Sequence, residues 1–196
     1  ALVSNTTASN NTAVGYQAGL ANTTGANNTS IGYQSLLDNT TGFSLTSVGW
    51  GSLANNTTGY ENVAVGVSAL RDNTTGLNNI AVGGSALLSN TTASNNTAVG
   101  YQAGYSNSTG TELTFFGYKA GANTTGSYNT YVGSQTGITN TSGTGNTAIG
   151  WGAISSSSGA TDNTAVGYGA GSSITTGSKN TIIGRYNGNQ GGLDIR

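Results

Sequence analysis

The sequence predicts an all-β protein, a parallel β-solenoid made of coils of 17 residues. Three observations carry this prediction. The segment SNTTASNNTAVGYQAG occurs at residues 4–19 and again, unchanged, at residues 89–104. A glycine recurs every 17 positions, with a single step of 16 residues. The composition, with 33 glycines among many Asn, Thr and Ser residues, has poor helix propensity, whereas a short fixed period is typical of solenoids.

The recurring glycines, called the strand glycines below, divide the chain into repeat units. They are Gly15, Gly32, Gly49, Gly66, Gly83, Gly100, Gly117, Gly133, Gly150, Gly167 and Gly184. We expect residues 1–184 to form a β-roll repeat domain of about eleven coils. We expect residues 185–196 to form a junction to a following module.

The residues just before each strand glycine predict a short strand. The residue directly before it is apolar in every unit, and the residue two positions earlier is always β-branched. Because side chains alternate between the two faces of a strand, these two positions share a face. Val63 and Ile80 occupy the earlier position, so we predict this face to be the inner one. The predicted structural core consists of Val14, Ile31, Val48, Val65, Val82, Val99, Phe116, Val132, Ile149, Val166 and Ile183.

The opposite face of the strand carries small residues and is predicted to contact other chains. A surface of alanine and glycine lets another backbone approach closely, and one thin coil buries little apolar area by itself. We therefore expect copies of the chain to meet around a three-fold axis, as a homotrimer that is intertwined or packed side by side. The candidate trimer face consists of Ala13, Ala64, Ala81, Ala98, Ala148 and Ala165.

A second extended segment and a turn complete each unit. Tyr or Trp often follows the strand glycine, as at Tyr16, Tyr33 and Trp50, and these rings are expected to stack from coil to coil. Such a row can fill an edge of the roll or contact sugars. The turn sequence N-T-T-G follows, in which Asn and Gly suit a tight turn. The same letters match the N-glycosylation sequon, for example at Asn22 and Asn39, so turn chemistry and glycan attachment are both interpretations of them.

An asparagine lies four residues before the strand glycine in nine of the eleven units. Stacked turns carry backbone groups that need hydrogen-bond partners, and asparagine side chains readily supply them. We predict an internal ladder in which each amide bonds to the next coil or to its own turn; glycan attachment and ligand contact are the alternatives. The ladder consists of Asn11, Asn28, Asn62, Asn79, Asn96, Asn129, Asn146, Asn163 and Asn180.

The motifs N-T-A-V-G at residues 11–15 and N-T-A-I-G at residues 146–150 resemble the N-S-V-A-I-G signature of YadA-type head repeats in trimeric autotransporter adhesins. The fuller pattern N-T-A-(V/I)-G-Y-x-A-L-x-x-N-T-T-G is similar to repeats of phage tail fibres, which often precede a self-cleaving intramolecular chaperone domain. The resemblance covers residues 5–184 and implies a trimeric, left-handed parallel β-roll. Units of 17 residues are longer than the YadA-type repeat, and Thr often replaces the inward Val.

The composition argues against several functions. The formal net charge is −1, so the chain has no basic surface for nucleic acid or anionic lipid. It has no His and no Cys, and its six acidic residues are scattered, so we expect no enzyme, no cofactor and no metal site. No run of about 18 apolar residues occurs, so we expect no membrane insertion by this segment.

These features predict a structural and adhesive role at a virion or bacterial cell surface. The first hypothesis is a stiff, homotrimeric segment of a phage tail fibre that presents a receptor-binding tip to a cell-surface glycan or protein receptor. The alternative is the head of a bacterial trimeric autotransporter adhesin that binds host or matrix surfaces. A third hypothesis is ice or crystal-surface binding through stacked turn threonines such as Thr23, Thr40 and Thr57.

Overall fold

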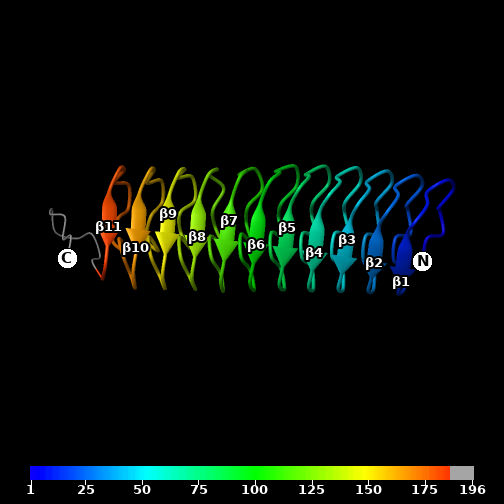
Figure 1. Ribbon diagram of the computed structural model, residues 1–196, viewed down its shortest axis with the longest axis horizontal. Helices are drawn as coiled ribbons and strands as arrows, with labels where there is room; N and C mark the ends of the chain where they lie inside the picture. Colours follow the sequence, from blue (N-terminus) through cyan, green and yellow to red (C-terminus); the bar gives the residue numbers. More distant parts are fainter. Residues whose placement is uncertain (186–196) are drawn as a thin grey trace.

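The computed structural model describes residues 1–185, which form an elongated stack of coils with one strand in each coil (Figure 1). Within this part of the chain, eleven three-residue strands form a single parallel sheet that follows the sequence order. The predicted all-β parallel solenoid with a 17-residue period is confirmed. The predicted junction lies outside the described residues, apart from Arg185. The strands are β1 Thr12–Val14, β2 Thr29–Ile31, β3 Thr46–Val48, β4 Val63–Val65, β5 Ile80–Val82, β6 Thr97–Val99, β7 Thr114–Phe116, β8 Thr130–Val132, β9 Thr147–Ile149, β10 Thr164–Val166 and β11 Thr181–Ile183.

The strands pair in the register that the repeat dictates. Thr12 lies opposite Thr29 in the sheet, so equivalent residues of successive units are neighbours. The single 16-residue step keeps the same register, because Thr114 pairs with Thr130. The connection between β7 and β8 therefore absorbs the missing residue without disturbing the sheet.

Each strand ends at its glycine for a steric reason. Gly66 has a φ angle of +135°, in a region that residues with a side chain rarely adopt. A Cβ atom at Gly66 would also lie 2.6 Å from the carbonyl oxygen of Gly83 in the next coil. The other strand glycines from Gly15 to Gly167 meet the same obstacle. Close stacking of the coils thus explains why glycine recurs with the period of the repeat.

The N-T-T-G turns stack through both backbone and hydroxyl groups. The amide nitrogen of Thr23 donates a hydrogen bond to the carbonyl oxygen of Thr40 at 2.9 Å, and Oγ1 of Thr23 donates to the same oxygen at 2.9 Å. Thr40, Thr57 and Thr74 repeat both bonds to the next coil. The turns therefore hold successive coils together on the side away from the sheet.

The inner face of the sheet is the alanine face, which corrects the sequence prediction. The central residue of most strands, which was predicted to contact other chains, points into the solenoid. Ala13 in the first coil is partly buried, and Ala64, Ala81, Ala98, Ala148 and Ala165 have no exposed surface. In this arrangement the alanine column cannot be a contact between chains.

The residues predicted to form the structural core lie on the outer face of the sheet instead. Val14 is 58% exposed and Phe116 is 56% exposed. Other members of the column are also exposed or only half-buried, and none is fully buried. They are Ile31, Val48, Val65, Val82, Val99, Val132, Ile149, Val166 and Ile183.

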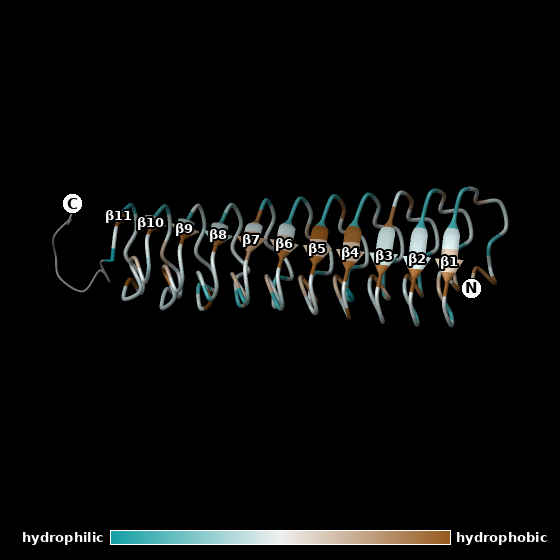
Figure 2. Cartoon of the chain, turned by 60° about the horizontal axis from the view of Figure 1, so that its bottom comes forward, coloured by the Kyte–Doolittle hydropathy of each residue, from teal (hydrophilic) through white to brown (hydrophobic). Residues whose placement is uncertain are grey.

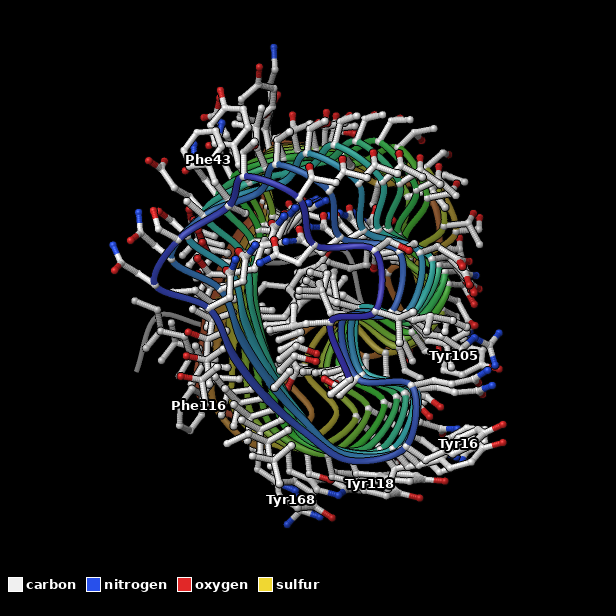
Figure 3. The ribbon with its side chains drawn as sticks, turned by 90° about the vertical axis from the view of Figure 1, so that its right-hand side faces the viewer. Tyr16, Phe43, Tyr105, Phe116, Tyr118 and Tyr168 are labelled. Carbon is white, nitrogen blue, oxygen red and sulfur yellow. The ribbon has the colours of Figure 1, made fainter. Side chains whose placement is uncertain are left out.

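The faces are reversed because side chains from the wall opposite the sheet fill the narrow interior (Figure 3). Leu70, four residues after its strand glycine, is fully buried and leaves room only for alanine on the strand. Where the strand carries a large inner residue, the opposite wall carries glycine. A Cβ atom on Gly121 would lie 2.5 Å from the ring of Phe115, and one on Gly137 would lie 2.4 Å from the ring of Tyr131. In these pairs, a large side chain on one wall thus faces a small residue on the other wall.

Candidate interaction surfaces

The predicted asparagine ladder is present inside the solenoid. Oδ1 of Asn28 accepts a hydrogen bond from the amide nitrogen of Leu45 at 2.9 Å, and Nδ2 of Asn28 donates to the carbonyl oxygen of Gly42 at 2.9 Å. Each amide thus satisfies two backbone groups of the following coil. The pattern recurs at Asn11, Asn62, Asn79, Asn96, Asn129, Asn146 and Asn163, and Asn180 donates to Asn163. The column is structural, because its amide groups are used within the fold.

The asparagines of the N-T-T-G turns form a second buried ladder. Nδ2 of Asn39 donates to Oδ1 of Asn22 in the preceding coil at 2.7 Å and to the carbonyl oxygen of Gly42 in its own turn at 3.0 Å. Both hydrogens of this amide are therefore engaged. Asn22, Asn39, Asn56, Asn73, Asn90 and Asn107 are all buried. A glycan attached to one of these asparagines would have to displace the ladder. The folded chain therefore favours turn chemistry over glycan attachment as the role of the N-T-T sequence.

The second ladder is interrupted at residue 124, in the connection between β7 and β8, close to a buried tyrosine. Thr124 stands at the ladder position, so the amide of Asn140 has no asparagine partner in the coil before it. Nδ2 of Asn140 donates instead to the hydroxyl oxygen of Tyr131, whose side chain is fully buried. Burial raises the pKa of Tyr131 to about 12. The hydroxyl belongs to the packing of the interior and is not accessible from the surface.

The first and third residues of β1–β11 form the outer strand face, the first candidate interaction surface. It combines the exposed Val, Ile and Phe column with a column of Thr, Val and Ile, and neither column contains a charged residue. Figure 2 shows hydrophobic colour concentrated on β4 and β5 and hydrophilic colour on the connecting turns. Because the strands are in register, equivalent side chains repeat along the whole sheet. The Val, Ile and Phe column therefore forms a continuous apolar strip along this face, which is typical of a contact surface.

The aromatic residues after the strand glycines form the aromatic row, the second candidate surface. Tyr16 stacks on Tyr33 with ring centroids 5.3 Å apart, and Tyr33 stacks on Trp50 at 6.2 Å. Tyr101 with Tyr118, and Trp151 with Tyr168, form two further stacked pairs. Figure 3 shows Tyr16, Tyr118 and Tyr168 pointing outward, around the corner from Phe116 of the outer strand face. The row therefore lies on the surface of the solenoid and does not fill its interior.

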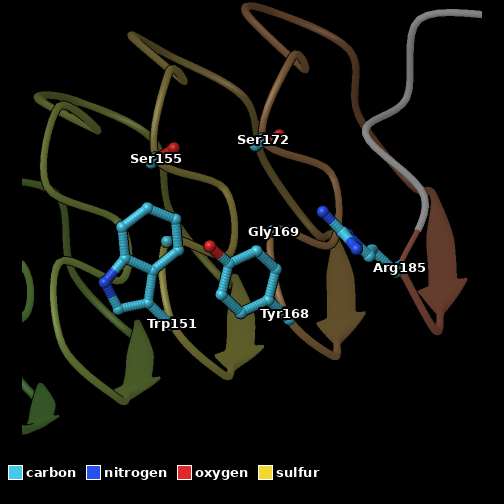
Figure 4. A pocket seen from close by; sticks show the side chains of 7 residues that line it. Trp151, Ser155, Tyr168, Gly169, Ser172 and Arg185 are labelled. Carbon is cyan, nitrogen blue, oxygen red and sulfur yellow. The ribbon is translucent and has the colours of Figure 1, made fainter.

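A groove of about 400 Å³ lies beside the last aromatic pair (Figure 4). Its lining combines two rings, two hydroxyl groups, two glycines and one guanidinium. The lining residues are Trp151, Gly152, Ser155, Tyr168, Gly169, Ser172 and Arg185. The ring centroids of Trp151 and Tyr168 are 4.8 Å apart, and the guanidinium of Arg185 lies 5.2 Å from the centroid of Tyr168. The groove thus brings hydroxyl groups and a guanidinium beside two exposed rings.

The acidic side chains of residues 1–185 are spread along the rod. No three acidic, His or Cys side chains of this part lie close enough to hold a metal ion. The ion pair between Arg71 and Asp72, at 2.8 Å, joins adjacent residues at the surface. The described residues also contain no helix that could span a membrane.

The fold and these surfaces define a class of protein, a parallel β-solenoid with one apolar sheet face and one aromatic edge. Comparisons of the chain with protein-family models, with curated proteins and with solved structures found no match.

Proposed function

We propose that the chain is a stiff segment of an extracellular or virion surface fibre, with a phage tail fibre as the first candidate. In this role it is a spacer that holds a receptor-binding tip away from the particle. The single observation that carries the proposal is the outer strand face, a charge-free apolar strip that runs along a rod. A stacked parallel sheet supplies the stiffness, because each coil is bonded to both neighbours.

The occupant of the outer strand face in this proposal is the same face of other copies, in a homotrimer. Identical chains carry the same 17-residue period, so coils of neighbouring chains can stay in step along the full contact. The face carries no charge, so bringing copies together creates no repulsion between like charges. The proposed contact therefore lies on the outer strand face and not on the buried alanine face. A bacterial adhesin head would use the same assembly, with the outer surfaces of the trimer binding host or matrix.

A comparison of light-scattering masses tests this proposal. The wild-type chain is expected to have three times the mass of one chain, and Val82→Arg is expected to have a lower mass because it places a charge in the contact. Thr75→Arg is the matched control, since Thr75 is exposed on an N-T-T-G turn and its variant should remain trimeric. A folded wild-type chain that is monomeric at every concentration would remove the basis of the proposal.

One observation favours a second candidate function, binding to ice or a crystal surface. Thr29 and Thr46 repeat in register on the outer strand face, beside Ile31 and Val48, and a regular array is what a crystal surface requires. The turn threonines suit this less well, because hydroxyls such as that of Thr23 already donate to the next coil. Thermal hysteresis measured on the purified chain decides the matter. Its absence at high protein concentration would exclude this candidate and leave the fibre proposal untouched.

A further inference from the structure

We propose that the groove beside Trp151 and Tyr168 binds an acidic saccharide, a pyranose that carries a carboxylate group. The biological setting of the site rests on the proposed function, because a surface fibre meets the glycans of other surfaces. The site itself depends only on the groove and its chemistry. It would make the shaft, and not only a distal tip, a binding element.

The aromatic pair provides a platform for a sugar ring. Trp151 and Tyr168 are stacked with an angle of 14° between their planes, yet they remain 48% and 55% exposed. Both side chains therefore keep surface that is open to solvent beside the groove. The C–H groups on one side of a pyranose carry partial positive charge, which the negative face of an aromatic ring attracts. Apolar surface with a few polar groups is the usual composition of a small-ligand site.

The space beside the platform comes from small residues at two positions of the coil. The residue after the aromatic one is Gly152 and Gly169 here, and the residue three positions further on is Ser155 and Ser172. Several other coils place larger side chains at one or both positions, namely Gln17, Gln34, Gln102 and Lys119 at the first and Leu20, Leu37, Leu88 and Tyr105 at the second. Both positions are also small in the coil of Trp50, at Gly51 and Ala54, but only beside Trp151 and Tyr168 do two successive coils of the described chain share this feature, and this opens the groove.

The fold itself does not require glycine at residue 169. A Cβ atom there would meet only Oγ of Ser172, at 3.9 Å, so packing leaves room for a side chain. Gly169 has a φ angle of +62°, but Gln34 occupies the equivalent position with a φ of 52°. In coils where the aromatic residue is also Tyr, such as those of Gln34 and Lys119, a side chain is accepted beside it. We attribute the glycine to the need for open space beside the two rings.

The polar groups of the groove suit an acidic sugar. The hydroxyls of Ser155 and Ser172 lie on the adjoining segments and can bond to sugar hydroxyls (Figure 4). Arg185 lies beyond Tyr168, and its guanidinium offers paired donors that match the two oxygens of a carboxylate. The described residues that line the groove include no carboxylate of their own. This charge complementarity favours an acidic ligand over a neutral one.

The groove lies on a different side of the rod from the proposed contact between chains. Figure 3 places Tyr168 at the bottom of the end-on view and Phe116, on the outer strand face, to its left. A trimer that buries the outer strand face would therefore present one such groove per chain. Binding and assembly can be tested independently for this reason.

The test is calorimetric titration of the assembled wild-type protein with an oligogalacturonate, and with the same oligosaccharide after reduction of its carboxylates to alcohols. We expect binding of the acidic form and clearly weaker binding of the reduced form. Trp151→Ala is expected to lower the affinity about tenfold or more. Arg185→Gln is expected to remove the preference for the acidic form. Trp50→Ala, in the same row but away from the groove, is the matched control and should bind as the wild type does.

A further variant separates loss of the site from loss of the fold. Gly169→Gln introduces the residue that other coils carry at this position, so it should melt like the wild type while its side chain blocks the groove. Failure of the wild type to bind either saccharide would overturn the proposal, as would binding that survives both Trp151→Ala and Gly169→Gln. Equal binding of the two saccharides would overturn the assignment of an acidic ligand. None of these results bears on the mass of the assembly, which tests the fibre proposal separately.

Discussion

At the scale of single residues, a large side chain on one wall of the interior is paired with a small residue on the other wall. Ala64 faces the wall that carries Leu70, whereas Phe115 and Tyr131 face glycines. Leu70 adopts a φ angle of 51°, a left-handed conformation that residues other than glycine, Asn and Asp seldom take. The cost of that conformation is offset by complete burial of the leucine side chain.

The exchange of volume predicts the behaviour of a double variant. Phe115→Ala should lower the free energy of unfolding by about 3–5 kcal/mol, because it leaves a cavity. Gly121→Leu alone should also destabilise, since its side chain would collide with the ring of Phe115. Combining the two restores the Ala–Leu pairing of other coils, so the double variant should be more stable than Phe115→Ala. Denaturant melts measure this, and simple addition of the two losses would refute the pairing.

The buried hydroxyl of Tyr131 predicts a loss of stability in alkali. Its pKa is raised to about 12, chiefly by burial, from the ordinary value of 10.0. A raised pKa means that the folded chain holds the proton more tightly, so this stabilisation is complete below pH 10 and is lost as the pH rises toward 12. Tyr131→Phe should cost about 1–2 kcal/mol at neutral pH, because the amide of Asn140 loses its partner.

Melts of both proteins between pH 8 and about pH 12 check this expectation. The difference in stability between wild type and Tyr131→Phe should shrink as the pH rises. A difference that stays constant over this range would mean that Tyr131 does not hold its proton in the way its burial implies.

At the scale of elements, the coil is the unit that the sequence encodes, and much of its structure could be predicted from the amino-acid sequence. The period, the strand before Gly66, the N-T-T-G turn and the ladder that includes Asn28 all follow from spacing and side-chain chemistry. The direction in which the strand faces could not be predicted in the same way. Both faces of a strand such as Val63–Val65 are apolar, so alternation alone does not say which face is inside.

The reversal of the two faces was decided by residues far from the strand in the coil. Leu70 enters the interior from the opposite wall in a backbone conformation that its residue type does not suggest. Small residues on the strand are then required inside, and Val65 is left outside. The groove beside Tyr168 was missed for a related reason: it depends on two positions becoming small in adjacent coils. Comparing each coil with the others, position by position, is the signal that could have revealed it.

Removal of a whole coil tests whether the coil is the structural unit. Deleting residues 56–72 takes out one period and joins Asn55 to Asn73, so every remaining residue keeps its column. Since each coil contacts only its neighbours, the shortened chain should fold with almost unchanged melting temperature. Deleting residues 56–63 removes about half a period, places turn residues against strands and should prevent folding. Circular dichroism melts compare the two, and equal tolerance of both deletions would contradict the stacked-column account.

At the scale of the whole molecule, the chain is a rod with chemically different sides. The sheet side is apolar and uncharged, the turn side is bonded by stacked threonines and asparagines, and the edge between them carries the aromatic row. With about 4.8 Å between neighbouring strands, the stack of coils extends for roughly 50 Å. A rod of this kind suits a fibre whose chains associate along one side and remain open to other molecules along another.

The central claim is that copies of the chain meet through the outer strand face, and site-directed cross-linking tests it most directly. The natural chain has no cysteine, so each single-cysteine variant reports one position. Val82→Cys, a small change on the outer strand face, should give linked chains with a short bismaleimide reagent, whereas Thr75→Cys on the turn side should not. Linking at Thr75 that equals or exceeds linking at Val82, or no linking at Val82 in an assembled sample, would contradict the account.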